Sequence, residues 1–274
     1  MHIDAHHHFW QYNPVEYDWI DDSMKKIRKD FLPGHLMDEL KKTSIEGVIS
    51  VQARQIIEET EWLLEFANEH SFIKGVTGWL PLIDPEIDKY LEKYSANKKL
   101  KAVRHVLQGE ADNYMLADNF YRGIQALKKY NLIYEVLITE SQLGNSIKVV
   151  DMHPDQIFVL DHIAKPLIKE GIISPWKENI IELSKRNNIY CKISGMVTEA
   201  DFQSWTPESL FPYMEVVLEA FGPERLLFGS DWPVCEVACE YSEWVDLVKK
   251  FLSQLSNIES DMIMGKNAIK IYNL

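Results

Sequence analysis

Residues 206–231, TPESLFPYMEVVLEAFGPERLLFGSD, contain one complete unit of the pattern that decides the fold. Apolar residues recur at helical spacing from Leu210 to Phe221, and Thr206-Pro207-Glu208 supplies the residue types that begin helices. Gly222-Pro223 ends this helix, and an apolar run then leads to Asp231, which predicts a short strand. The stretch is therefore a helix followed directly by a buried strand.

The same alternation of strand and helix runs through the whole chain. The expected strands are Ile3–Phe9, Val48–Ala53, Gly75–Leu80, Leu100–Leu107, Leu132–Ile138, Phe158–His162, Ile189–Ser194 and Leu226–Asp231. Nearly continuous Val/Ile/Leu runs are typical of parallel strands that helices cover. No linker rich in glycine, serine or proline divides the chain, and no glycine-rich phosphate loop follows the first strand, which disfavours a doubly wound sheet. We predict a single α/β domain over residues 1–274, a (β/α)8 TIM barrel.

Composition narrows the range of partners and compartments. The 29 Lys and Arg residues against 42 Asp and Glu residues give a net charge of −13, which disfavours nucleic acids and acidic membrane surfaces. No apolar run approaches the ~18 residues of a membrane span, and we see no signal-peptide pattern. Cys191, Cys235 and Cys239 show no disulfide framework and no complete zinc knuckle. We expect a cytoplasmic protein that acts on a small molecule, and the possibility of a homo-oligomer stays open.

Histidines at the end of the first expected strand are the first candidate functional residues. Strict alternation would place Asp4, His6 and His8 on one face and the intervening residues on the other. Two imidazoles two residues apart on one face of a strand can share a cation. His6 and His8 are therefore candidate metal ligands at the mouth of the barrel.

Two further strand ends carry catalytic residue types. Asp231 shares a face with Leu227 and with Gly229, whose missing side chain leaves room near the mouth. A carboxylate at this position can bind a metal, deprotonate water, or do both. His162 is expected to face inward alongside Leu160. We predict that His6, His8, His162 and Asp231 gather at one site.

Other polar or aromatic residues near strand ends are candidate contacts for a substrate. They are Gln52, Arg54, Trp79, Arg104, His105, Lys192 and Trp232. Glu135 lies inside an apolar strand and needs a partner if it is buried.

Four stretches in order carry a resemblance to a known family: VRHVLQG at 103–109, VLDHIAKP at 159–166, YCKISGMVTEAD at 190–201 and LEAFGPERLLFGSDWPV at 218–234. Together with His6-x-His8, they resemble the amidohydrolase superfamily. More narrowly, they resemble the amidohydrolase-2 branch that contains L-fuconolactonases and L-rhamnonolactonases. The resemblance extends over essentially the whole chain. It implies a barrel with its site at the C-terminal mouth and an enzyme that hydrolyses sugar-acid lactones.

The chemistry of lactone hydrolysis suggests roles for the candidate residues. Asp231 would act as general base, and His162 would position the water or protonate the departing oxygen. The oxyanion would be stabilised by a cation, by His6 and His8, or by Arg104 and Lys192. Gln52, Arg54 and His105 would hold sugar hydroxyls, and Trp79 or Trp232 would pack on the ring.

The implied cofactor is one divalent cation, zinc, held by His6, His8 and Asp231. Glu135 would be either a further oxygen ligand or, as a buried carboxylate, the partner of Lys192 or Arg104. Metal-dependent members of the superfamily commonly place a histidine where this chain has Glu135, and the lactonase branch shares an acid there. We therefore expect zinc binding without a strict requirement of zinc for activity. Two alternatives stay open: a metal-dependent, non-oxidative decarboxylase of the same superfamily, and a non-catalytic barrel that binds sugar or metal.

Overall fold

The eight expected strands are present in the computed structural model, which describes residues 1–274. They are β1 His2–His7, β2 Ile45–Val51, β3 Ile73–Gly78, β4 Leu100–Val106, β5 Ile133–Leu137, β6 Phe158–Leu160, β7 Ile189–Ile193 and β8 Leu226–Phe228. Neighbouring strands pair in parallel and in sequence order. Beyond β8 the chain returns to β1, where the Asp231 amide donates to the His6 carbonyl at 2.8 Å. This nearly closed ring confirms the predicted (β/α)8 barrel.

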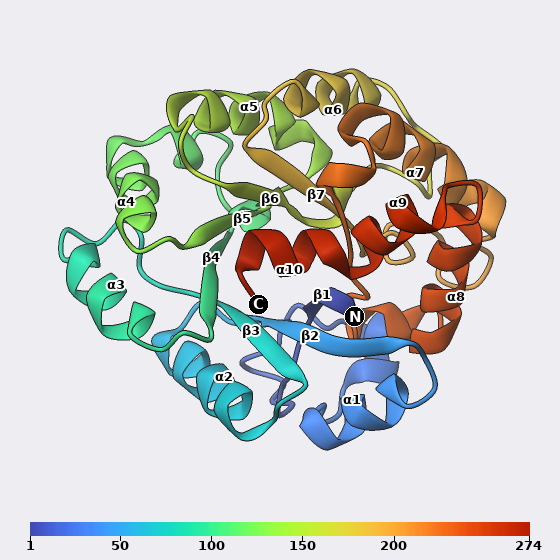
Figure 1. The fold of residues 1–274 in the computed structure, drawn as a ribbon, viewed down its shortest axis with the longest axis horizontal. Helices are drawn as coiled ribbons and strands as arrows, with labels where there is room; N and C mark the ends of the chain where they lie inside the picture. Colours follow the sequence, from blue (N-terminus) through green and yellow to red (C-terminus); the bar gives the residue numbers. More distant parts are fainter.

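Helices surround the strands and also close one end of the barrel. They are α1 Pro33–Leu40, α2 Ile57–Glu69, α3 Ile87–Ser95, α4 Asp118–Lys129, α5 Leu143–Met152, α6 Trp176–Ser184, α7 Pro207–Phe221, α8 Tyr241–Leu252, α9 Asn257–Asp261 and α10 Asn267–Tyr272. Figure 1 shows α1 to α8 around the outside and α10 across the centre, beside both chain ends. No helix combines the length and the apolar character needed to cross a bilayer. Because β1 begins at this end, α10 covers the N-terminal ends of the strands and leaves the opposite mouth free.

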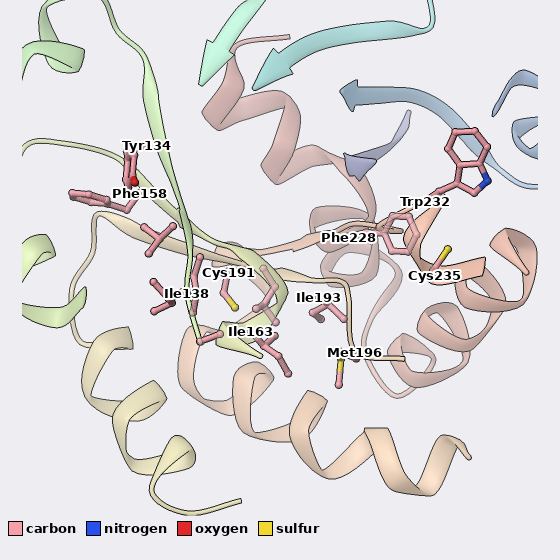
Figure 2. Packing of buried hydrophobic residues seen from close by; sticks show 14 of the residues in the cluster. Tyr134, Ile138, Phe158, Ile163, Cys191, Ile193, Met196, Phe228, Trp232 and Cys235 are labelled. Atoms are coloured by element: carbon pink, nitrogen blue, oxygen red, sulfur yellow. The ribbon is translucent and has the colours of Figure 1, made fainter. Parts of the chain in front are cut away.

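The apolar core has an outer and an inner layer. The outer layer lies between strands and helices, and Figure 2 shows Ile163, Cys191 and Ile193 within it. All three cysteines are buried and free. The inner layer fills the lower half of the barrel, which is the half at the N-terminal ends of the strands. It consists of Ile3, Ala5, Ile49, Ala102, Ile133, Val159 and Leu227 from the strands with Ala268 and Tyr272 from α10. Layers of side chains inside such a barrel make it a packed core rather than a pore.

Two predictions about side-chain direction are wrong, each for a local backbone reason. In β1, Asp4 pairs with Val48 and His7 pairs with Ser50, so one extra residue forms a bulge between them. The bulge turns Asp4 outward, toward α8, while His6 still faces inward.

In β6 the inward residue is Val159, and Leu160 belongs to the outer layer. The strand ends at Leu160, two residues earlier than predicted. His162 reaches the interior because the backbone from His162 to Lys165 is left-handed, with φ between 48° and 62°. Strict alternation therefore fails within β1 and at the end of β6.

Candidate active site

A cavity of about 410 Å³ opens at the C-terminal ends of the strands. Its lining includes four of the predicted residues, His8, Arg104, His162 and Asp231. Each of these residues is at least nine-tenths buried. This is the position at which (β/α)8 enzymes carry their active sites.

Asp231 lies at the centre of the histidine cluster. Its Oδ1 is 3.3 Å from His8 Nε2 and 3.7 Å from His6 Nε2, and the two histidine nitrogens are 3.2 Å apart. The other ring nitrogen of His8, Nδ1, lies 2.9 Å from the carbonyl oxygen of Val51, which can only accept a hydrogen bond. His8 therefore donates through Nδ1, and its Nε2 faces both Asp231 and His6.

The backbone at Asp231 adopts a strained conformation. Its φ is 59°, in the left-handed region that non-glycine residues rarely occupy. The preceding Gly229 makes the close packing possible, because a Cβ there would lie 2.8 Å from the Cβ of His6. Burial alone would raise the pKa of Asp231, but His162 and the hydrogen bond from His8 outweigh it and lower that pKa below its usual value. Asp231 is therefore ionised at neutral pH, as a general base must be.

His162 completes the cluster from the left-handed turn after β6. Its Nδ1 lies 2.9 Å from the Ser194 hydroxyl, and its Nε2 lies 3.9 Å from Asp231 Oδ1. A side chain at Gly195 would come within 2.4 Å of His162 Nδ1, so this position requires glycine. Burial lowers the pKa of His162 to about 4, which keeps the ring neutral at neutral pH.

A network of buried charges lies directly beneath the cluster. The Lys192 ammonium is 3.1 Å from His6 Nδ1, 3.0 Å from Asp161 Oδ1 and 2.7 Å from Glu135 Oε2. Asp161 Oδ2 also pairs with Arg104 Nη1 at 3.1 Å. Burial would raise the pKa of Asp161, but Lys192 and His6 outweigh it and hold that pKa well below its usual value. The network holds His6 in place through Lys192 and holds Arg104 in place through Asp161.

Comparison with known proteins identifies the family. A family model described as "Amidohydrolase" matches residues 3–274. This chain belongs to the amidohydrolase family. It is 36% identical over 286 residues to an L-fucono-1,5-lactonase of Burkholderia multivorans, covering 100% of this chain and 96% of that protein. A second L-fucono-1,5-lactonase, from Burkholderia ambifaria, is 30% identical over 99% of this chain and 95% of its own length.

A solved structure agrees with this assignment. A crystal structure of an amidohydrolase from Burkholderia multivorans with bound zinc has a TM-score of 0.97 and 35% identity. The match covers 100% of this chain and 99% of that one. The fold and the placement of the strands are therefore those of an experimentally determined amidohydrolase.

In this amidohydrolase Glu135 does not stand beside the other expected metal ligands. Its carboxylate accepts hydrogen bonds from Thr77 Oγ1 at 2.8 Å and from Tyr272 Oη at 2.6 Å, and it pairs with Lys192. The Lys192 ammonium thus lies between Glu135 and His6. The buried charge of Glu135 is therefore paired with Lys192 and does not need a metal ion in the cavity.

Only one of the seven expected substrate contacts, Arg104, lines the cavity, and Lys192 lies beneath it. Gln52 is buried, and its amide donates to the Arg104 carbonyl at 3.3 Å. Arg54 pairs with Glu59 at 2.6 Å and with Glu16 at 2.8 Å. Neither Gln52 nor Arg54 is among the residues that line the cavity.

The aromatic candidates also lie off the cavity. Trp79 Nε1 donates to His105 Nδ1 at 3.2 Å, and His105 stacks on the ring of Tyr114. Trp232 packs edge-to-face on Phe31 with ring centroids 5.1 Å apart. Trp79 directly follows β3, His105 lies near the end of β4, and Trp232 lies four residues beyond β8. None of the three side chains lines the cavity.

Several lining residues were not predicted, because they come from the loops and short 3-10 helices that follow the strands. They are Trp19, Met24, Gln108, Lys165, Thr198, Glu199, Phe202 and Val234. Lys165 and Glu199 form an ion pair at 2.9 Å on the cavity wall. Loops carry no periodicity that assigns a direction to a side chain. Asp161, which belongs to the charged network, was also missed. The sequence did carry a signal for it, because it is an acid next to His162 at the end of an apolar strand.

Proposed function

We propose that this amidohydrolase opens a sugar-acid lactone to the free acid, with Asp231 as general base. The observation that carries the proposal is a buried carboxylate, Asp231, that lines the cavity together with Arg104 and stands within 4 Å of His6 and His8. The two L-fucono-1,5-lactonases, similar over nearly their whole length, support a substrate of the same class.

The first step is attack of water on the lactone carbonyl. Asp231 takes a proton from the water while the oxygen–carbon bond forms. The neutral His162, whose Nε2 faces Asp231 at 3.9 Å, orients the same water. Arg104 stabilises the negative charge that develops on the carbonyl oxygen, because a guanidinium held by Asp161 needs little reorganisation.

The second step breaks the ring. The bond between the carbonyl carbon and the ring oxygen cleaves, and the departing alkoxide recovers the proton held by Asp231. The product is a hydroxy acid, and at neutral pH its carboxyl group releases one proton to solution. Gln108, Lys165 and Glu199 offer polar contacts for ring hydroxyls, and Trp19 and Phe202 offer apolar ones.

The residues present also fit a divalent cation. The ligand atoms of His6, His8 and Asp231 lie within 4.8 Å of one another, and two imidazoles with one carboxylate are a donor set that zinc accepts. A bound zinc ion would polarise the lactone carbonyl. We propose that such an ion binds less tightly than in a closed four-ligand site, since the charges of Arg104 and Lys192 stand beside His6.

A pH-indicator assay tests this function. Aldonolactones with five- and six-membered rings, including L-fucono-1,5-lactone, are offered to metal-stripped and to zinc-loaded protein, and proton release is followed. We expect hydrolysis of at least one six-membered lactone in both forms. If neither form hydrolyses any lactone, the proposal is wrong, and release of carbon dioxide from aromatic acids then tests the decarboxylase alternative.

A further inference from the structure

The seam between β8 and β1 is built differently from the other seven joints of the barrel. At each of the other seven joints at least three residues pair in a parallel ladder, although the joints from β1 to β4 also contain bulges. At the seam, β8 ends at Phe228, and the chain beyond it meets β1 only through an isolated bridge between His7 and Trp232. Asp231 stands in this irregular segment, and His6 stands opposite it. The two sides of the active site therefore meet where the ordinary ladder is missing.

The carboxylate of Asp4 fills the place of the missing ladder. Its Oδ1 accepts hydrogen bonds from the backbone amides of His6 at 3.1 Å and Ser230 at 2.9 Å. Its Oδ2 accepts from the Ser230 hydroxyl at 2.6 Å and from the Tyr241 hydroxyl at 3.2 Å. One side chain thus joins β1, the segment before Asp231, and α8. Asp4 is fully buried, so water does not compete for these bonds.

The bulge in β1 explains why a side chain is needed here. The extra residue between Asp4 and His7 lets His6 face inward, but it also interrupts the regular pairing with β2. The His6 amide then turns to Asp4. On the other side, the left-handed φ of 59° at Asp231 persists only if its neighbours hold it in place. The Ser230 amide and hydroxyl, which Asp4 binds, directly precede that residue.

We propose that Asp4 is a positioning residue, a clasp that sets the separation between Asp231 and the His6–His8 pair without touching the substrate. The expected effect of the clasp on turnover rests on the proposed lactone hydrolysis, whereas its effect on the structure of the seam does not. A misplacement of about 1 Å costs roughly 10²-fold in rate, whereas the affinity of the cavity for substrate depends on other residues.

The direct test measures the seam itself. Hydrogen exchange is followed by mass spectrometry in segment 228–234 for the wild type, Asp4→Ala and Asp4→Asn. In Asp4→Asn the amide oxygen can accept both backbone N–H groups and the amide nitrogen can donate to both hydroxyls, so the clasp is retained. We expect exchange in this segment to quicken about 10- to 100-fold in Asp4→Ala and to stay near the wild-type rate in Asp4→Asn.

Kinetics on a lactone substrate give the second readout. In Asp4→Ala we expect kcat to fall about 10- to 100-fold with KM little changed, and in Asp4→Asn we expect kcat within about threefold of the wild type. Gln156→Leu is the matched control. Gln156 is also buried and bonds the carbonyls of Leu132 and Ile157 at 2.8 and 2.9 Å, but it lies near the covered end of the barrel. This control should lose stability and keep both kcat and the exchange rate of segment 228–234.

The outcomes separate the clasp from the proposed function. Wild-type exchange in Asp4→Ala would overturn the clasp, as would an equal loss of kcat in Gln156→Leu. If Asp4→Ala does not fold, Tyr241→Phe removes one of the four bonds and leaves the other contacts of the seam in place, so it should quicken exchange in the same segment to a smaller degree. If the wild type hydrolyses no lactone, the proposed function fails, while the exchange measurement still decides the clasp.

Discussion

The lower and upper halves of the barrel interior differ in chemistry although the same strands enclose both. On β4, β5 and β6 the lower half presents Ala102, Ile133 and Val159, whereas two residues further along the same strands stand Arg104, Glu135 and Asp161. Hydrocarbon packing stabilises the first group, and mutual pairing offsets the desolvation of the second. The apolar layer that stabilises the barrel and the charged layer that supports the active site are therefore only two residues apart along each strand.

The largest loss of turnover should follow a substitution of Asp231, which lines the cavity. Asp231→Asn keeps the shape of the side chain but removes its basicity, so we expect turnover to fall by about 10²–10⁴. The free energy of unfolding should change little, since no packing is lost. Steady-state kinetics and thermal unfolding of the same preparation check this. Near-normal turnover in the folded variant would remove Asp231 from the role of base.

Lys192→Met tests the charged layer. The change leaves Glu135 without its cation and Asp161 with Arg104 alone, so we expect a loss of about 3–5 kcal/mol in the free energy of unfolding. Urea unfolding measures it. The double variant Lys192→Met with Glu135→Gln is the control and should recover part of the loss. If the single variant is as stable as the wild type, this layer is not held by charge pairing.

Leu227→Ala tests the apolar layer below. Leu227 is fully buried inside the barrel, and its truncation should cost about 3 kcal/mol through lost transfer energy and a residual cavity. We expect kcat to stay at the wild-type value below the unfolding transition. A clear loss of kcat in a fully folded sample would show that the two halves of the interior are coupled.

Tyr272→Phe tests the link between the two halves. Tyr272 belongs to the apolar layer, but its hydroxyl bonds Glu135 at 2.6 Å. Removing the hydroxyl should cost about 1.5 kcal/mol, the usual scale for a hydrogen bond to a charged group. Chemical denaturation measures the loss, and Tyr90→Phe on α3 provides an aromatic control at a partly buried position. A neutral result would mean that Thr77 and Lys192 satisfy Glu135 without help.

Chelation should reduce turnover much less than Asp231→Asn does. A lactone is an activated ester with a tethered leaving group, so it needs less electrophilic help than an amide. After dialysis against a strong chelator we expect turnover to fall by a smaller fraction than zinc content, both measured on one sample. Loss of turnover in proportion to zinc, with recovery on reloading, would make the ion an essential electrophile.

The sequence predicted the strands well, because parallel barrel strands are continuous apolar runs that a one-dimensional pattern reveals. It also placed His6, His8 and Asp231 at the strand ends that meet at the mouth. It failed where the backbone leaves the regular repeat. The bulge turned Asp4 outward, and the left-handed turn that begins at His162 brought His162 to the site.

The substrate contacts were harder to predict for a different reason. Trp79 and His105 end strands as expected, yet each satisfies the other with a hydrogen bond away from the cavity. Lys165 and Glu199, which do line the cavity, come from loops that have no periodic pattern. A polar residue at a strand end indicates a site only after its own partners are known.

The helix that covers the lower end of the barrel has a practical consequence. Residues 1 and 274 both lie at this end, beside α10 (Figure 1), and the Asn273 carbonyl accepts a hydrogen bond from Lys101 at the start of β4. A support or fusion module attached through either terminus would therefore stand behind the barrel, on the side away from the cavity. Molecules tethered in this way to a surface would share one orientation, with every mouth turned toward the bathing solution.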